Sequence, residues 1–290
     1  MNNGRIWKTG VLAVIATIAF ASFVFRSEEW TKGLRSHFLA LGQTGTPPGG
    51  KAITKIIPQI AVGSFDGNVT SYRTVTEIVN TGSSTVSVTG NFYNQNGSTS
   101  TLTFTTNLAA IPTFSGMLAP TNLSANQILV ITGGAASTGT VNWGKIVSNP
   151  GTVSVSTYFE FRDATTDRLY SRVGVQASVA DMASFVIPRV RNVADGLDVG
   201  FVLVNTGTAP ATINATLRDT TGAILSSKSL AMSAGQHTAQ FIQGFFGLRA
   251  EPGGTSYSFV VFDSASSQFA AVALAIEGGS LASFPVDRLR

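Results

Sequence analysis

Cysteine is absent from this sequence, and histidine occurs only twice. The lack of cysteine excludes a disulfide framework, thiolate metal sites and a cysteine nucleophile. It does not fix the compartment, because a domain above about 100 residues is stable on its hydrophobic core alone. Neither histidine has a partner at metal-ligand spacing. We expect His37 in a short helix near the N-terminus and His237 in an exposed or capping position at the start of another helix.

Charged residues are also scarce, at 12% of the chain, whereas 43% of residues are hydrophobic, so the chain is a folded protein and not an intrinsically disordered one. The formal net charge of +4 is unevenly divided. Residues 1–56 hold seven Lys/Arg and two acids, and residues 57–290 hold twelve Lys/Arg and thirteen acids. A nucleic-acid-binding protein carries its positive charge on the folded domain. We therefore expect no nucleic-acid partner.

Sequence patterns of known catalytic or metal sites are lacking as well. Asp66, and the pair Asp195 and Asp198, fall in roughly equivalent loops, but calcium needs six to eight oxygen ligands, so turns are the better interpretation. GGSLA at 278–282 lacks the strand-turn-helix context of a nucleophile elbow. In the segment Gly133–Lys145 the lysine does not follow the last loop glycine as in a phosphate cradle, which favours a long loop. We expect no metal, no cofactor and no enzymatic activity; a hydrolase whose carboxylates converge only in three dimensions is the enzymatic alternative.

Residues 1–26 predict an export signal. Arg5 and Lys8 precede fifteen mostly apolar residues, Val11–Phe25. This run is shorter than the ~20 residues of a typical membrane-spanning helix, and Ala19–Ala21 has the small-x-small pattern that signal peptidase needs. Cleavage after Ala21 would leave the apolar SFVF on the mature protein, so an uncleaved membrane anchor is the alternative. In both cases the positive charges hold the N-terminus in the cytoplasm, and the rest is expected outside it.

Residues 27–51 predict a short helix and a linker. Ser27 can cap the segment SEEWTKGLRSHFLALG, and its apolar residues share one face, which suits either a membrane surface or packing on the first domain. The following QTGTPPGGK contains two prolines and three glycines, which sustain neither a helix nor a strand ladder. The domain boundary is therefore expected near Lys51.

A strand-turn-strand pattern occurs twice in the remainder. VNTGSSTVSVTGNFYNQNG covers Val79–Gly97, and VNTGTAPATINATLRDTTG covers Val204–Gly222, 125 positions later without an insertion. In each, Asn can bond its own backbone, Gly can take a positive φ, and the closing glycine predicts a second turn. Such self-similarity indicates a duplicated structural unit.

The correspondence continues outward from these segments. IIPQIAVG matches VIPRVRNV, each with a proline that suits an edge or first strand position, and LSANQILV matches MSAGQHTA. Short apolar or alternating runs separated by turns every 8 to 12 residues predict an all-β fold of antiparallel sandwiches. We expect one β-sandwich over residues 52–183 and a second over 184–290. In the second, AGQHTAQFIQGFFG predicts a helix of one to three turns, and Val204 is predicted to lie in the core.

The VNTG turn, the alternating strand and the closing glycine turn resemble the Ig-like and fibronectin-like sandwich modules of secreted bacterial surface proteins. The resemblance covers roughly residues 55–290 and concerns architecture; it implies no functional residue. Such modules act as spacers, as adhesive or glycan-contacting surfaces, or as accessory domains beside enzymes.

Runs of aromatic residues offer one candidate binding surface. Phe92 and Tyr93 are adjacent, as are Tyr158 and Phe159, with Phe161 close by. Adjacent residues of a strand point to opposite faces, so part of this aromatic surface faces solvent, or is buried against the neighbouring domain. The sequence thus favours an exported, non-enzymatic structural or adhesive protein with a cell-envelope protein or polysaccharide partner. A carbohydrate-binding accessory module using Tyr and Phe is the alternative.

Overall fold

The computed structural model describes residues 51–64, 69–134, 136, 138–178, 181–188, 191–192, 197–248, 258–266, 268–277, 280–284 and 286–289. The predicted export signal or anchor, the following helix with His37 and most of the linker lie outside these residues. The described chain is an all-β protein of antiparallel sheets with one short helix, α2 (Ile242–Phe246). No described helix has the length and apolar character needed to cross a membrane.

Strands β1–β10 form two sheets, which we call unit 1 (residues 53–176). Sheet A has the order β1 (Ile53–Val62), β8 (Thr140–Asn149), β3 (Val86–Asn94), β6 (Met117–Leu123). Sheet B has the order β10 (Leu169–Gln176), β9 (Val153–Asp163), β2 (Thr70–Asn80), β7 (Ile128–Gly133), β4 (Thr103–Thr106), β5 (Thr113–Ser115). Side chains from both sheets, among them Ile78 and Leu118, form a shared core.

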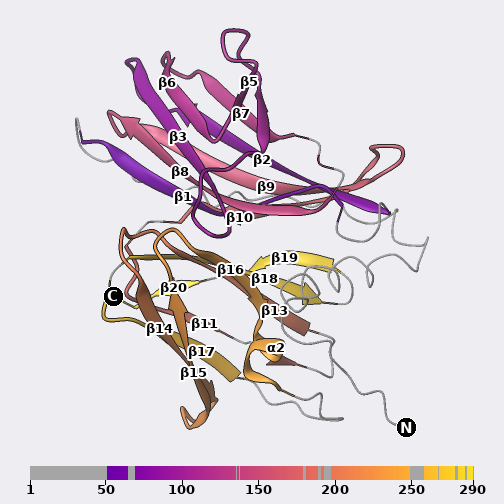
Figure 1. Ribbon diagram of the computed structural model, residues 1–290, viewed down its shortest axis with the longest axis vertical. Helices are drawn as coiled ribbons and strands as arrows, with labels where there is room; N and C mark the ends of the chain where they lie inside the picture. Colours follow the sequence, from indigo (N-terminus) through magenta and orange to yellow (C-terminus); the bar gives the residue numbers. More distant parts are fainter. Residues whose placement is uncertain are drawn as a thin grey trace, which may run out of the picture.

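Strands β11–β20 form the second pair of sheets, unit 2 (residues 184–288), below unit 1 in Figure 1. Sheet C has the order β12 (Arg191–Asn192), β13 (Leu197–Asn205), β18 (Phe269–Glu277), β19 (Ser280–Phe284), with β16 (His237–Phe241) also paired to β13. Sheet D has the order β15 (Ile224–Met232), β14 (Ala211–Asp219), β17 (Ser258–Asp263), β11 (Ser184–Ile187), β20 (Asp287–Arg288). Phe185, Phe201 and Phe262 lie in the core of this unit, onto which α2 packs with Ile242 and Phe246.

The two NTG turns are built by the same hydrogen bonds. The side-chain amide of Asn80 donates to Ser84, Leu123 and Ser124 carbonyls at 2.7, 3.0 and 3.0 Å. The amide of Asn205 donates to Ala209, Met232 and Ser233 carbonyls at 3.0, 3.2 and 3.0 Å. Both asparagines are completely buried. Each one therefore ties its strand end to two other backbone segments.

The asparagine side chains also form the expected bond to their own backbone. Asn80 Oδ1 accepts from the Gly82 N–H at 2.9 Å, and Asn205 Oδ1 accepts from the Gly207 N–H at 3.0 Å. The expected positive φ at these glycines is wrong: positive φ occurs instead at the closing glycines, 84° at Gly97 and 86° at Gly222. Gly82 is required for space, because a Cβ there would lie 2.7 Å from Thr152 Oγ1.

One segment in each unit differs from the sequence-based expectation. The helix predicted over AGQHTAQFIQGFFG is limited to its second half, because His237–Phe241 form β16 and pair with β13 over its length. Paired with Val204, His237 is a strand residue and not a helix cap. In unit 1, the predicted long loop ends earlier than expected, since β8 begins at Thr140 and includes Lys145.

Candidate functional site

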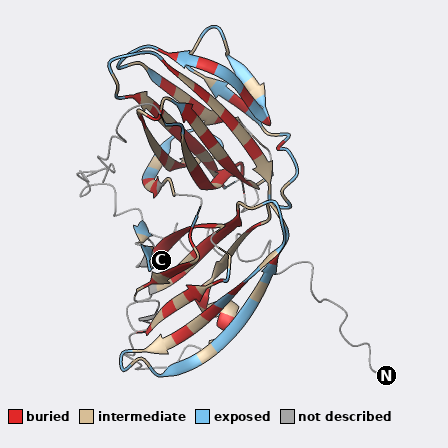
Figure 2. Cartoon of the chain, turned by 90° about the vertical axis from the view of Figure 1, so that its left-hand side faces the viewer, coloured by how far each residue is buried: buried red, intermediate tan, exposed pale blue. Residues whose placement is uncertain are grey.

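The two units meet in an apolar junction made of two clusters. One cluster joins Tyr72, Phe159 and Phe161 of unit 1 to Val202 and Leu274 of unit 2. A second cluster joins Ile56 and Trp143 of unit 1 to Val204 and Ala270, with Tyr93 packed against it. The part of sheet B that carries Tyr72, Phe159 and Phe161 and the outer face of sheet A thus both cover sheet C. The strands of sheet C next to unit 1 are largely buried in Figure 2.

Strand β13 is buried on both faces, which explains its nearly continuous apolar sequence. Phe201 and Leu203 point into the core of unit 2, whereas Val202 and Val204 point into the junction. Val204 is therefore buried as predicted, with no exposed surface, but it faces unit 1 and not the core of its own sandwich. A strand covered on both faces is the middle layer of the molecule.

Most of the aromatic residues singled out in the sequence are buried. Phe92 lies in the core of unit 1, and Phe159 and Phe161 lie in the junction. Tyr93 stacks on Trp143 at 4.3 Å between ring centroids, also at the junction. Burial against the neighbouring unit, one of the two interpretations left open by the sequence, is correct for Phe159 and Phe161, and Tyr93 is partly buried there. Tyr158 alone of the five points to the outer face of sheet B.

Hydrogen bonds accompany the apolar contacts of the junction. Trp143 Nε1 donates to the Gly235 carbonyl at 2.9 Å. The backbone N–H of His237 donates to the Gln95 carbonyl at 2.8 Å. The turn around Gly97 lies so close to unit 2 that a Cβ on Gly97 would be 2.8 Å from the Ala234 carbonyl oxygen. Gly97 therefore serves the junction as well as its own turn.

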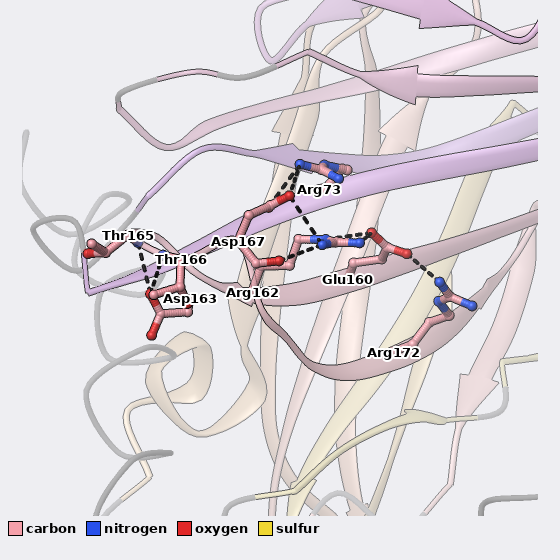
Figure 3. Close-up of polar contacts among 8 residues, drawn as sticks. All are labelled: Arg73, Glu160, Arg162, Asp163, Thr165, Thr166, Asp167 and Arg172. Carbon is pink, nitrogen blue, oxygen red and sulfur yellow. Dashed lines mark hydrogen bonds and ion pairs between the residues drawn. The ribbon is translucent and has the colours of Figure 1, made fainter.

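The outer face of sheet B carries the main cluster of ion pairs, shown in Figure 3. Glu160 on β9 is 3% exposed. Its carboxylate binds Arg162 at 2.8 Å and Arg172 of β10 at 2.5 Å. Asp167, in the β9–β10 turn, accepts from Arg73 of β2 at 3.0 Å and lies 3.4 Å from Arg162. The arginines and carboxylates thus alternate across three neighbouring strands.

The ionisation of this cluster follows from its contacts. Burial alone would raise the pKa of Glu160, but hydrogen bonds and charge from Arg172 and Arg162 outweigh it and lower that pKa. Burial, followed by the charge of Glu77, raises the pKa of Tyr158. Tyr158 donates to Glu77 Oε1 at 3.2 Å, and the Arg172 guanidinium lies over its ring at 4.6 Å from the centroid. One face of the tyrosine ring is therefore already covered by a cation.

The β9–β10 turn is held by a second carboxylate. Asp163 accepts from the N–H groups of Thr165 and Thr166 at 2.9 and 2.8 Å, and from the Tyr170 hydroxyl at 2.5 Å. These hydrogen bonds, the one from Tyr170 first, hold the pKa of Asp163 far below its usual range. This fixed turn positions Asp167 beside Arg73.

The remaining candidates from the sequence do not converge. Asp66 and Asp195 lie outside the described residues, whereas Asp198 is half-buried on β13, where burial raises its pKa to about 6. Ser280 of GGSLA lies in the β18–β19 hairpin, as the sequence predicted, and not in a strand-turn-helix. Among the residues that the structure describes, no three His, Cys, Asp or Glu side chains are grouped so as to hold a metal ion.

Comparison with known proteins gives no family. No protein-family model and no curated protein matches the chain. Solved structures with a weak likeness include an exo-beta-D-glucosaminidase, CsxA (11% identity, TM-score 0.17, 73% of this chain and 25% of that one). Others are an anti-sigma factor domain-containing protein (10%, 0.16, 79% and 89%) and the Pleurotus ostreatus lectin (12%, 0.13, 81% and 80%). The chain spans about a quarter of the length of the glucosaminidase, and TM-scores this low carry no argument.

Proposed function

We propose that this chain is an exported, non-enzymatic structural or adhesive protein of the cell surface, built from two Ig-like repeats that act as one stiff body. The junction carries the proposal. Phe159 and Phe161 pack on Val202 and Leu274, so bending between the units would expose apolar surface at about 25 cal/mol per Å². A fixed arrangement of two sandwiches suits a spacer or a displayed adhesive surface.

The matching geometry of the two NTG turns supports the duplication that this proposal includes. The matching bonds of Asn80 and Asn205, and the matching positive φ of Gly97 and Gly222, are what a duplicated Ig-like or fibronectin-like unit would retain. These groups hold loops together and are not available for chemistry, because their polar atoms are already paired. These paired groups therefore support a structural role for the two units.

Export is tested by the location and mass of the mature protein. Cells are separated into cytosolic, membrane and soluble extracytoplasmic fractions, and the intact mass is measured in each. A chain beginning at Ser22 in the soluble extracytoplasmic fraction, or the full chain in the membrane fraction with residues 52–290 sensitive to added protease, supports the proposal. The intact chain in the cytosol overturns it. The first result directs the search for partners to extracellular ligands, the second to the cell envelope.

The structural or adhesive role needs a separate test. A strain without the chain is compared with strains expressing the wild-type protein or Val204→Asp, which is designed to open the junction. Loss of attachment or envelope integrity that only the wild-type chain restores supports a role for the stiff two-unit body. Full rescue by exported Val204→Asp contradicts the importance of the junction. Normal attachment and envelope integrity without the chain contradict the role itself.

Polysaccharide binding is the second candidate, because Tyr158 lies on a solvent face beside the carboxylate of Glu77. The Arg172 guanidinium over the ring limits stacking, so a sugar would have to displace it or bind at the ring edge. A glycan array with the full chain tests this function. Binding that Tyr158→Ala removes and Tyr93→Phe retains favours it, and no binding by the folded wild-type chain rejects it.

A further inference from the structure

His237 occupies an unusual position for an ionisable residue. It is 4% exposed and pairs with Val204 of β13, so both side chains lie on the junction face of sheet C. Its own N–H donates to the Gln95 carbonyl of unit 1 at 2.8 Å. The imidazole is therefore enclosed at the contact between the two units and not inside either sandwich.

Neither ring nitrogen of His237 has a hydrogen-bond partner in the part of the chain that the structure describes. Val204, the residue that pairs with His237, belongs to an apolar cluster of the junction with Ala270 of β18, Ile56 of β1 and Trp143 of β8. The neutral imidazole is tolerated there as a largely apolar ring. An imidazolium would be a desolvated cation without an acceptor, which is far more costly.

The ionisable groups on these same faces do not compensate such a cation. β3 contributes Tyr93, which packs against the cluster, and β8 contributes Lys145, which shares the outer face of sheet A with Trp143. The turn following β3 contributes the uncharged Gln95. On β13, Asp198 lies on the junction face but six residues away from Val204, roughly 20 Å along an extended strand.

We propose that His237 is a proton-operated latch of the junction: uptake of one proton by its imidazole opens the contact between the two units, while each sandwich remains folded. Water then reaches the imidazolium, and the apolar faces around Val204 and Trp143 become exposed. The latch is closed at neutral pH and opens in acid. It does not depend on the proposed export or on any surface role.

The direction of the pH effect agrees with this geometry. Burial lowers the pKa of His237 from 6.5 to about 4. The contribution of His237 to the closed state is therefore full above pH 6.5, decreases as the pH falls below that value and is lost below about pH 4. Asp198, whose pKa is raised to about 6, acts oppositely, since its protonated form is the one that burial favours.

Trp143 provides the readout, because its indole N–H bonds across the junction and its ring stacks on Tyr93. The full chain carrying Trp7→Phe and Trp30→Phe has Trp143 as its single tryptophan. Its emission and its far-UV circular dichroism are followed from pH 7.5 to 3.5. We expect a reversible red shift between about pH 6 and 4, while the β signal persists.

His237→Gln is the test variant and His37→Gln the matched control. We expect His237→Gln to move the midpoint of the red shift down by about one pH unit or more, and His37→Gln to leave it unchanged. Equal midpoints in all three chains overturn the latch. Loss of the β signal together with the red shift in the wild-type chain also overturns it, because the whole protein then unfolds.

A direct titration keeps the proposal testable should His237→Gln fail to fold. The imidazole of His237 is followed by NMR in the His37→Gln chain, labelled only at histidine. Titration well below pH 6.5, with a midpoint that coincides with the Trp143 shift, supports the latch. Titration near pH 6.5, or titration without a change at Trp143, overturns it.

Discussion

At the scale of single residues, stability depends most clearly on the two buried asparagines. Each side chain donates three hydrogen bonds to backbone carbonyls and accepts one from a glycine N–H of its own turn. We expect Asn80→Ala and Asn205→Ala each to lower the free energy of unfolding by about 2–3 kcal/mol, because buried carbonyls lose their donor. Urea denaturation measures the effect. Asn214→Ala is the control, since Asn214 is exposed and its side chain accepts a hydrogen bond from the Ser229 hydroxyl, and a loss as large as that of Asn205→Ala contradicts the argument.

Glu160 gives a residue-scale prediction with a pH dependence. We expect Glu160→Gln to destabilise the chain by about 1–2 kcal/mol at neutral pH, because both arginines lose a charge-assisted bond. The pKa of Glu160 is lowered from its usual 4.5, so the carboxylate contributes fully above that value and less as the pH falls through its lowered pKa. Denaturation at pH 7 and pH 3 should therefore show a smaller difference from wild type in acid. Glu77→Gln is the control, and a pH-independent difference at Glu160 contradicts the prediction.

At the scale of elements, β13 has adjacent residues that are buried in two different places, the core of unit 2 and the junction. Leu203 and Val204 both have no exposed surface, but Leu203 lies between sheets C and D and Val204 lies in the junction. We expect Leu203→Asp to abolish folding of unit 2, because its carboxylate has no route to water. We expect Val204→Asp to open the junction and leave both sandwiches folded. Circular dichroism and small-angle scattering distinguish the outcomes, and an equal loss of β structure in both variants refutes the distinction.

Local patterns were enough to predict most elements, and they failed where burial depends on distant segments. The strands β2, β3, β13 and β14 lie where the repeated segments predicted them, because alternation and turn residues are local signals. β16 was missed because the spacing of its apolar residues also fits a helix, and pairing with β13 decided the conformation. For the same reason His237 gave no sign of burial. Its neighbours Val204 and Gln95 are distant in sequence, and only the assembled sheet brings them together.

The charged cluster of sheet B was missed for a related reason. Glu77, Glu160 and Arg172 are far apart in a chain with few charges, so no local sequence pattern groups these three residues. Antiparallel register places Arg73, Glu160 and Arg172 side by side on three strands. A signal was present in the strand itself, since Glu160 lies between Phe159 and Phe161. Alternation predicts that a residue between two junction aromatics lies on the opposite face.

At the scale of the whole molecule, the junction predicts that the two units unfold together at neutral pH, where it is closed. Each unit leaves an apolar face uncovered without the other, so unfolding of one unit alone is unfavourable. Calorimetry should therefore show one transition, with a ratio of calorimetric to van't Hoff enthalpy of about 1. Phe161 and Leu274 are 3% and 5% exposed and both lie in the junction. Replacing both by alanine removes roughly 5–10 kcal/mol of packing, which should split the transition in two. Leu118→Ala is the control: it weakens the core of unit 1 and leaves the junction intact, so a single transition should persist at a lower temperature. Two transitions in the wild-type chain would mean that the units are independent, and the stiff body proposed for the cell surface would then lose its physical basis.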